Sequence, residues 1–273
     1  MRHVTSSTVL ACRNQRGLQT DTVESLAEET PIAFVYNGHP HAVMMATPSD
    51  LEDLAIGFTL TEGIVEDPNK IEIIDCLSTV DGISLQMLIP QARADALDVR
   101  ERNMTGRTGC GLCGAGTLAA AIRPVRQIHT DSTLSLESLF DGFLRLERSQ
   151  PLNHATGAVH AAAVICSDGE FLAREDVGRH NAIDKVFGAA ARSRVQVLAL
   201  LVTSRASYEV VHKAAQAGCS IVAAISAPTA LAVRLAEQAG VTLVGFARAP
   251  RATIYANPQR IIRSLKVDAS VIG

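Results

Sequence analysis

The spacing of apolar residues in the first part of the chain predicts a small unit of strands and helices. From Thr30 to Pro48, apolar residues at strand spacing flank Asn37-Gly38, a dipeptide typical of tight hairpin turns, which predicts two short strands. A helix is expected to follow, with Ser49 as its N-cap and Glu52 as the capping-box partner. Further strands are expected at 71–79 and 82–90, helices at 96–104 and 117–122, and a loose segment at 1–20.

Beyond Pro124, apolar runs of strand length alternate with amphipathic segments of helix length. The run 195–204 is apolar at almost every position, as in a strand that is buried on both faces. The alternation predicts a parallel sheet covered by helices, and therefore an α/β fold. We expect two domains, a smaller α+β domain at 1–130 and an α/β domain at 131–273. The expected strands lie within 158–176 (two, around Asp168-Gly169), 195–204, 220–226 and 241–248, and the helices at 134–150, 178–192, 207–218 and 229–240.

Composition places the chain among globular proteins with a substantial core. Of the 273 residues, 47% are hydrophobic and 19% are charged, which excludes an intrinsically disordered chain. The formal net charge of −3 argues against broad nucleic-acid binding and against a basic membrane-surface protein, since both need a cationic field. We find no apolar run of about 18 residues and no secretory signal. We therefore expect a cytoplasmic protein without nucleic-acid or membrane partners.

Cysteine spacing singles out one pair. In a long chain that is expected in the cytoplasm, a disulfide framework is not expected. Cys76, Cys166 and Cys219 lie in or beside apolar stretches and are expected to be small core residues. Among the six cysteines, only Cys110 and Cys113 form a pair with CxxC spacing, in the loop GRTGCGLCGAGT, where five glycines surround them. The remaining one, Cys12, lies in the polar N-terminal segment.

Three interpretations of the Cys110–Cys113 loop stay open from the residues alone. A structural zinc site needs four ligands, and the chain has no second CxxC and no HxxxH partner. A thioredoxin-like redox pair normally opens a helix directly after a strand, which fits this loop poorly. The third interpretation is a mobile loop that carries sulfur as a cysteine persulfide, where Arg107 or a following helix would favour the reactive thiolate.

Polar residues follow three of the expected strands in the second half. Because parallel strands end at the same edge of a sheet, these residues are expected to converge on one crevice, where open α/β sheets bind ligands. Hydroxyls and helix N-termini bind anions, and arginine adds a charged fork that matches phosphate. The hydroxyls are either plain N-caps or part of a site for a phosphorylated or nucleotide ligand. The set comprises Thr203, Ser204, Arg205, Ser207, Ser226, Thr229, Arg248 and Arg251.

A further group of polar residues surrounds the start of the helix expected at 178–192, in the string EDVGRHNAIDK. This group is either a site or a capped helix with surface charges, in which Asp184 pairs with His180 one turn away. His160, in the apolar strand before it, is expected to be a satisfied core residue.

Together these motifs resemble the FdhD/NarQ family, the formate dehydrogenase accessory sulfurtransferases. The order of GRTGCGLCG before EDVGRHNAIDK is a specific combination. The resemblance covers most of the chain, from about residue 31 to residue 260. The strings that carry it are FVYNGHPHAVMMATPSDLEDLAIGFTLTEGI, GRTGCGLCG, HAAAV, EDVGRHNAIDK, VTSRASYEVVHKAA, SAPTALAV and GFARAPRATIYANPQR.

The resemblance implies a sulfurtransferase. Members take sulfur from a cysteine desulfurase as a persulfide and pass it to the molybdenum (or tungsten) bis(molybdopterin guanine dinucleotide) cofactor, a bound substrate, before its insertion into formate dehydrogenase. The persulfide cysteine corresponds to Cys110 and its companion to Cys113, and no permanent metal is implied. The cofactor-binding segment corresponds to Phe246, Ala247, Arg248, Ala249, Pro250 and Arg251, and we expect Ser204, Arg205, Ser226 and Thr229 to help hold the phosphates.

The resemblance also implies a homodimer and a fold similar to cytidine deaminases, with a three-layer C-terminal domain beside the smaller α+β domain. Deamination itself is not expected, because a zinc deaminase needs an HxE motif followed by PCxxC. Here Ala162 stands two residues after His160, and the CxxC precedes the histidine. Two other functions stay open: a non-catalytic chaperone that binds the cofactor, and a thiol–disulfide oxidoreductase.

Overall fold

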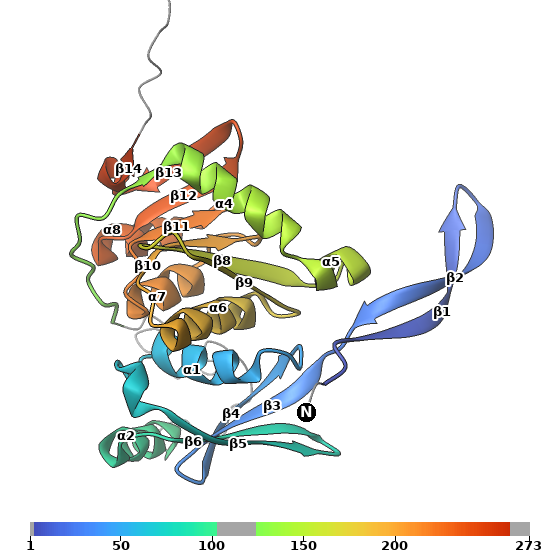
Figure 1. Cartoon of the computed structure of the whole chain (residues 1–273), viewed down its shortest axis with the longest axis horizontal. Coiled ribbons are helices and arrows are strands. Elements are labelled where there is room, and N and C mark those ends of the chain that lie inside the picture. The colour runs from blue at the N-terminus through green and yellow to red at the C-terminus, as the bar shows by residue number, and fades with distance from the viewer. Residues whose placement is uncertain (1–2, 103–123, 263–273) are drawn as a thin grey trace, which may run out of the picture.

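The computed structural model describes residues 3–102 and 124–262, which form two packed units and a projecting N-terminal hairpin (Figure 1). The larger unit is built on a six-stranded sheet with the order β13-β12-β11-β10-β8-β9. Its strands are β8 (His160–Cys166), β9 (Phe171–Asp176), β10 (Val197–Val202), β11 (Ile221–Ala224), β12 (Thr242–Arg248) and β13 (Arg251–Ala256).

The sheet is mixed, so the prediction of a parallel sheet is correct only for its centre. β10, β11 and β12 run parallel, whereas β8, β9 and β13 pair antiparallel with their neighbours. The physical reason is the length of the connections. Only a few residues join β8 to β9 and β12 to β13, and such short links can connect only antiparallel strands.

Helices cover both faces of this sheet (Figure 1). α4 (Leu136–Arg148) packs on one face, and α6 (Arg179–Ser193), α7 (Tyr208–Gln216) and α8 (Ala230–Ala239) pack on the other. Along β10 the side chains alternate between the two cores: Leu201 lies in the core on the α4 side and Leu200 in the core on the α6–α8 side. This arrangement confirms the mixed α/β class, while the likeness to cytidine deaminases stays a prediction.

The smaller unit is a four-stranded sheet with the order β4-β3-β6-β5. The turn at Asn37-Gly38 has positive φ at both residues (50° and 83°), so the predicted hairpin is confirmed. The elements are β3 (Thr30–Tyr36), β4 (His39–Ala46), α1 (Leu51–Thr61), η1 (Pro68–Lys70), β5 (Glu72–Thr79), β6 (Gly82–Leu88) and α2 (Gln91–Arg102).

The predicted capping box at the start of α1 is wrong. Asp50, not Ser49, is the N-cap, with a left-handed φ of 50°, and its side chain makes no capping hydrogen bond. The acidic side chains of this turn pair with arginines of the larger unit instead. Asp53 is bound by Arg174 and by Arg192, each at 2.7 Å. At the start of α1, ion pairs with the larger unit therefore take the place of the capping hydrogen bonds that the sequence predicted.

α1 and α6 cross with their backbones in contact. A Cβ atom on Gly57 would lie 1.7 Å from the carbonyl oxygen of Asp184, and one on Gly188 would lie 1.8 Å from the carbonyl oxygen of Asp53. Only glycine fits at these two positions, because any side chain would occupy the space of a neighbouring backbone atom. This crossing, the α1–α6 joint, holds the two units together.

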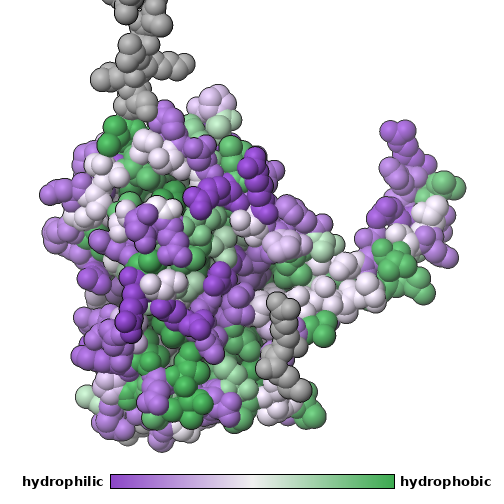
Figure 2. Space-filling view, viewed as in Figure 1, coloured by the Kyte–Doolittle hydropathy of each residue, from purple (hydrophilic) through white to green (hydrophobic). Residues whose placement is uncertain are grey.

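The expectation of a loose segment at 1–20 is wrong. β1 (Ser6–Gln15) and β2 (Leu18–Ala27) pair in continuous antiparallel register. Their two-residue turn, Arg16-Gly17, has positive φ at both positions, as tight hairpins require. We refer to residues 6–27 as the N-terminal arm; the later part of β2 contacts α5 (Pro151–Thr156), and the rest projects away from both units (Figures 1 and 2). Neither face of the arm packs on a core, so the sequence carries no alternation that would predict its strands.

The segment from Pro124 onward runs along the larger unit. The backbone NH of Ile128 donates to the carbonyl of Ala239 at 2.8 Å, and its side chain joins the core beneath α6–α8. The predicted helix at 117–122 lies outside the described residues, and the domain boundary at residue 130 stays a prediction. Short elements complete this unit: β7 (Leu134–Ser135), α5 (Pro151–Thr156), η2 (Pro258–Arg260) and β14 (Ile261–Ile262). Within 3–102 and 124–262, no helix is long and apolar enough to cross a bilayer.

Candidate functional site

The residues that follow β10, β11 and β12 lie side by side at one edge of the large sheet, which we call the strand-end edge. Backbone hydrogen bonds join the three segments directly. Thr229 NH donates to Ala206 O at 3.0 Å, and Phe246 NH donates to Ser226 O at 3.1 Å. The structure therefore brings together the segments that contain Ser204, Arg205, Ser226, Thr229 and Phe246–Arg251, as their strand positions predicted.

The hydroxyl groups at this edge do not all have the same role. Thr229 Oγ1 accepts a hydrogen bond from Ala232 NH at 3.2 Å and caps α8, so the N-cap interpretation is correct for this residue. Ser204 is buried, and its Oγ donates to the carbonyl of Arg205 at 3.1 Å. Arg205 itself is exposed beside them.

The turn between β12 and β13 presents an aromatic ring and two cations. Phe246 has a left-handed φ of 50° and is 38% exposed. The Arg251 guanidinium lies 5.4 Å from the centre of that ring, and Arg248 pairs with Arg251 across the hairpin. Ala247, in contrast, is fully buried in the sheet. Of the segment expected to bind the cofactor, the Ala247 side chain is buried, and the others are exposed: Phe246, Arg248, Ala249, Pro250 and Arg251.

The strand-end edge continues past β10 to the start of β8 and the start of α6. His180 Nε2 lies 3.3 Å from Glu209 Oε2 on α7 and 3.3 Å from Arg179 Nε. The hydrogen bond from His180 lowers the pKa of Glu209 to about 2. His160 is half-buried at the same edge, and burial, followed by the nearby Arg179 and His180, lowers its pKa. Sequence reasoning named His160, Arg179 and His180 but missed Glu209 as their partner.

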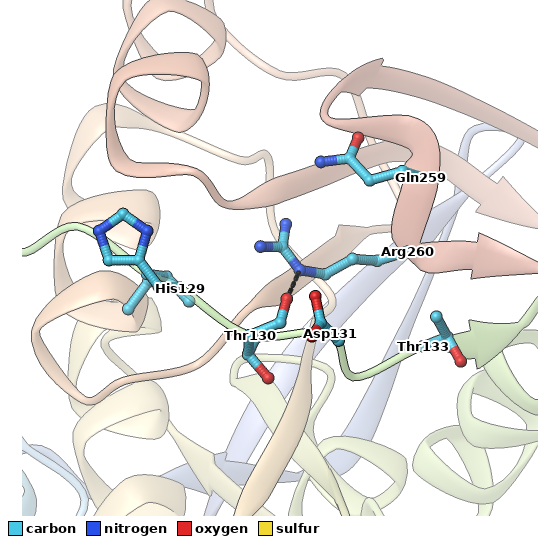
Figure 3. Close-up of a pocket in the computed structure, with 7 residues that line it drawn as sticks. His129, Thr130, Asp131, Thr133, Gln259 and Arg260 are labelled. Carbon is cyan, nitrogen blue, oxygen red and sulfur yellow. Dashed lines mark hydrogen bonds between the residues drawn. The ribbon is translucent and has the colours of Figure 1, made fainter.

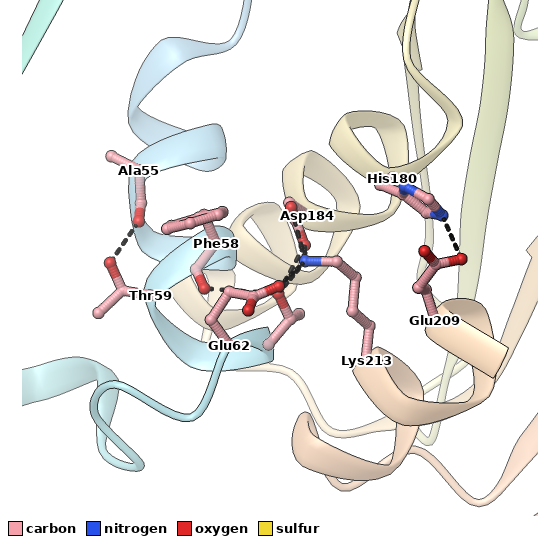
Figure 4. A network of polar contacts seen from close by, with 9 residues as sticks. Ala55, Phe58, Thr59, Glu62, His180, Asp184, Glu209 and Lys213 are labelled. Atoms are coloured by element: carbon pink, nitrogen blue, oxygen red, sulfur yellow. Dashed lines mark hydrogen bonds and ion pairs between the residues drawn. The ribbon is translucent and has the colours of Figure 1, made fainter. Parts of the chain in front are cut away.

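The alternative in which Asp184 pairs with His180 one turn away is wrong. Asp184 is fully buried and faces α1 and α7, where it accepts hydrogen bonds from Lys213 Nζ at 2.8 and 3.0 Å and from Thr61 (Figure 4). Lys213 also bonds Glu62 at 2.8 Å. Figure 4 shows this network beneath α1, apart from the His180–Glu209 pair.

A second buried ion pair lies beside this network. Lys185 Nζ is 2.6 Å from Asp176 Oδ2 and donates to the carbonyl of Thr47 at 2.9 Å. Asn181 donates both to Asp176 and to the carbonyl of Met45. The string EDVGRHNAIDK therefore has two parts: its buried residues bind the units to each other, and Arg179 and His180 line the strand-end edge.

Cys110 and Cys113 lie outside the described residues. The chain that follows them is fixed at Pro124, whose carbonyl lies 3.3 Å from His212 Nε2 on α7. Cys166 and Cys219 are buried, as predicted for core residues, and burial raises their thiol pKa values to about 11 and about 12. Thiols with such pKa values are not nucleophilic near neutral pH.

A polar hollow of about 510 Å³ lies at the opposite edge of the large sheet (Figure 3). Arg260, which is only 6% exposed, donates to Thr130 O at 3.2 Å and to Gly240 O at 2.8 Å, just before β12. These bonds tie the segment after Pro124 to the end of α8. The hollow shares no residue with the strand-end edge. It is lined by Ile128, His129, Thr130, Asp131, Thr133, Gln259 and Arg260.

Comparison with known proteins gives consistent matches. The sequence model of the FdhD/NarQ family matches residues 27–262. A sulfur carrier protein FdhD from Xanthomonas euvesicatoria pv. vesicatoria is 49% identical over 259 residues, covering 93% of this chain and 92% of the relative. One from Cupriavidus necator is 48% identical over 260 residues, covering 94% of this chain and 90% of the relative.

A solved structure has a similar fold. It is described as a formate dehydrogenase accessory protein from Desulfotalea psychrophila, with a TM-score of 0.73 and 24% identity, and the match covers 95% of this chain and 100% of that one. The family match spans both units of the fold and the strand-end edge. This chain therefore belongs to the FdhD/NarQ family.

Proposed function

We propose that this protein is a sulfurtransferase that carries sulfur as a persulfide on Cys110. It takes the sulfur from a cysteine desulfurase and delivers it to the molybdenum bis(molybdopterin guanine dinucleotide) cofactor, its bound substrate, for use in formate dehydrogenase. Relatives that are nearly half identical to this chain are named sulfur carrier proteins, which supports the sulfur step. The homodimer and the cytidine-deaminase-like scaffold belong to the same proposal.

The strand-end edge is the observation that carries the proposal. Arg205, Arg248 and Arg251 are exposed there, at the ends of strands where an open α/β sheet can receive an anion. Guanidinium groups match phosphate oxygens in geometry and charge. The exposed Phe246 ring offers a flat apolar surface to a purine. A guanine dinucleotide supplies both phosphates and purines.

The loading step needs only the Cys110 thiolate and the persulfide of the donor. The thiolate attacks the terminal sulfur, a new S–S bond forms on Cys110, and the S–S bond of the donor breaks with its cysteine leaving as thiolate. No external oxidant or reductant enters this exchange. Cys113 is the companion thiol that assists release: its thiolate attacks the inner sulfur of the Cys110 persulfide, a Cys110–Cys113 disulfide forms, and the outer sulfur leaves at the sulfide level for delivery. The oxidised protein must then be reduced by a thiol before the next cycle.

The experiment is an intact-protein mass measurement after incubation with a cysteine desulfurase and cysteine. We expect the parent and Cys113→Ala to gain one sulfur that a reductant removes, and Cys110→Ala to gain none. A sulfur gained equally by Cys110→Ala would overturn the assignment of Cys110. No gain in any of the three proteins would overturn the sulfur-carrier function itself.

The strand-end edge also favours a second candidate, a chaperone that binds the cofactor without a sulfur step, because none of its described residues is a cysteine. The two candidates differ in what the cysteines do for formate dehydrogenase. In a strain that lacks the native protein, Cys110→Ala should bind guanosine diphosphate normally but fail to support formate dehydrogenase activity. Full activity with Cys110→Ala would favour the chaperone.

A further inference from the structure

Basic side chains gather at the part of the strand-end edge that lies beyond β10, away from the β12–β13 turn. His160 stands at the start of β8, and Arg179 and His180 open α6. Glu209 lies in the first turn of α7. The backbone NH of Thr203, just past β10, bonds to β8 and so brings that strand to the edge. Figure 4 shows His180 and Glu209 pointing toward each other from α6 and α7. We call His160, Arg179, His180 and Glu209 the histidine cluster.

The histidine cluster carries more positive charge than its own carboxylate can balance. Glu209 is the one acid in it, and its Oε2 is already bound by His180 Nε2 at 3.3 Å and by the Ser207 hydroxyl at 3.1 Å. Within the part of the chain that the structure describes, no carboxylate lies within 4 Å of the Arg179 guanidinium, although this side chain is partly buried. By contrast Arg174, which is also partly buried, is held by two aspartates of the smaller unit. Since partly buried guanidinium groups are normally paired, Arg179 is placed to meet an anion from outside the chain.

His160 responds to this excess of positive charge. Burial, followed by the nearby Arg179 and His180, lowers its pKa below the ordinary value of 6.5, so the ring is uncharged at neutral pH. The residue opposite it on β9 is Asp176, whose carboxylate is bound by Lys185 at 2.6 Å. The carboxylate on α7 is bound by His180. An anion beside Arg179 would balance the positive charge around His160 and raise its pKa, so a proton would bind together with the anion.

We infer that the histidine cluster is a second anion subsite, which binds the metal-carrying end of the substrate while the β12–β13 turn binds its nucleotide end. The inference rests on the proposed function and adds which part of the substrate each half of the strand-end edge takes. Three strand spacings separate β12 from β8 in the sheet, which is about 14 Å at about 4.8 Å per strand. That span is longer than a diphosphate. In the proposed substrate, the metal and its anionic sulfur ligands lie beyond the diphosphate, and they therefore reach the cluster.

The members of the histidine cluster have different parts in holding the anion. Arg179 supplies a guanidinium that contacts the anion directly, as such groups do with oxyanions. His160 gains a proton as the anion binds, which adds a second positive charge. Glu209 fixes the orientation of the His180 ring by binding its Nε2, and so acts as a positioning residue. The subsite therefore places positive charge where the substrate receives its sulfur.

The test is calorimetric titration of the full chain with molybdate, a small dianion of the metal, with and without saturating guanosine diphosphate at constant ionic strength. We expect molybdate to bind in both cases, because subsites about 14 Å apart do not exclude each other. Arg179→Gln should weaken molybdate binding at least about 10-fold, since it removes a charge-assisted hydrogen bond, and should leave guanosine diphosphate binding unchanged. The matched control is Arg248→Ala at the other end of the edge, which should weaken guanosine diphosphate binding and leave molybdate binding unchanged.

The same titration at pH 8 and pH 6.5 examines the proton. Molybdate affinity of the parent should rise as the pH falls, and His160→Gln, which cannot take up the proton, should show a flatter dependence. Guanosine diphosphate binding without molybdate binding would refute the subsite and leave the proposed function standing. Molybdate that guanosine diphosphate displaces, or that Arg179→Gln binds as tightly as the parent, would also refute it. Molybdate binding that depends on Arg179 in a protein that does not bind guanosine diphosphate would support the subsite and contradict the proposed nucleotide site.

Discussion

Replacing Lys213 by Met should destabilise the protein strongly, because it leaves a carboxylate buried without its cation. Asp184 is fully buried, and Lys213 contacts both of its carboxylate oxygens, at 2.8 and 3.0 Å. Burial alone would lower the pKa of Lys213, but the attraction of Asp184 and Glu62 outweighs it and holds that pKa above its ordinary value. Lys213 is therefore charged in the folded protein, and its charge compensates Asp184.

The size of the loss in unfolding free energy follows from the Asp184 carboxylate, which stays buried after Lys213 is replaced. Removing one partner of a buried ion pair costs about 3–5 kcal/mol, since the remaining charge is neither solvated nor paired. Removing both charges costs much less, because an uncharged pair needs no compensation. The double variant Lys213→Met/Asp184→Asn, which keeps an acceptor for the Thr61 hydroxyl, should lose only about 1–2 kcal/mol, the cost of imperfectly paired polar groups.

The stability loss caused by Lys213→Met should also depend on pH, and it should become smaller as the pH falls. Burial raises the pKa of Asp184 in the folded protein, and without Lys213 only the hydrogen bond from Thr61 opposes that rise. The folded state then binds a proton more readily than the unfolded chain, so the variant regains stability as pH falls through the folded-state pKa. The loss caused by Lys213→Met should be larger at pH 8 than at pH 5.5.

Urea unfolding of the parent, Lys213→Met and the double variant at both pH values measures these differences. A loss below about 1 kcal/mol in Lys213→Met would refute the reasoning, as that is the scale of an exposed ion pair. A loss that grows as the pH falls would refute it too, because it would mean that Asp184 is not the group left uncompensated.

Three further predictions concern other parts of the molecule. Gly57→Ala should destabilise by about 1–3 kcal/mol or more in urea unfolding, because its methyl group would overlap the α6 backbone, and a loss near zero would contradict the α1–α6 joint. His180→Gln should return the Glu209 pKa from about 2 toward its ordinary value of 4.5, as measured by carboxyl NMR titration, and an unchanged pKa would mean that His180 is not the cause. Arg248→Ala/Arg251→Ala should weaken guanosine diphosphate binding at least about 10-fold in calorimetry and flatten its salt dependence, since each lost charge-assisted bond is worth about 1.5–3 kcal/mol. Equal affinity would remove the strand-end edge from the proposed site.

Much of the fold could be predicted because local signals agreed with the final packing. The turn Asn37-Gly38 has the backbone that its residues prefer, and the strand 197–202 is apolar on both faces because both faces are covered. The convergence of Ser204, Ser226 and Phe246 at one edge also followed from strand direction alone. In each case, neighbours in sequence or a simple topological rule determined the result.

The contacts that could not be predicted join residues that are distant in the sequence. Asp184 bonds Thr61, 123 residues away, and not His180 on the next turn, because α6 turns Asp184 toward α1. No spacing rule reveals such a pair. The N-terminal arm could not be predicted for a different reason: hydrophobic alternation reports burial against the chain's own core, and the arm has none. The sites of Cys110 and Cys113 stay predictions from the sequence and the family.

The α1–α6 joint makes the contact between the two units resemble an obligate subunit interface inside one chain. It combines backbone contact at Gly57 and Gly188 with ion pairs that join the two units, from Asp53 to Arg174 and Arg192 and from Glu62 to Lys213. Separating the units would break these ion pairs and expose the surfaces that α1 and α6 bury against each other, so the two units should melt in a single cooperative transition. The small sheet is therefore held in one orientation relative to the strand-end edge, because Gly57 and Gly188 have no side chains to keep α1 and α6 apart.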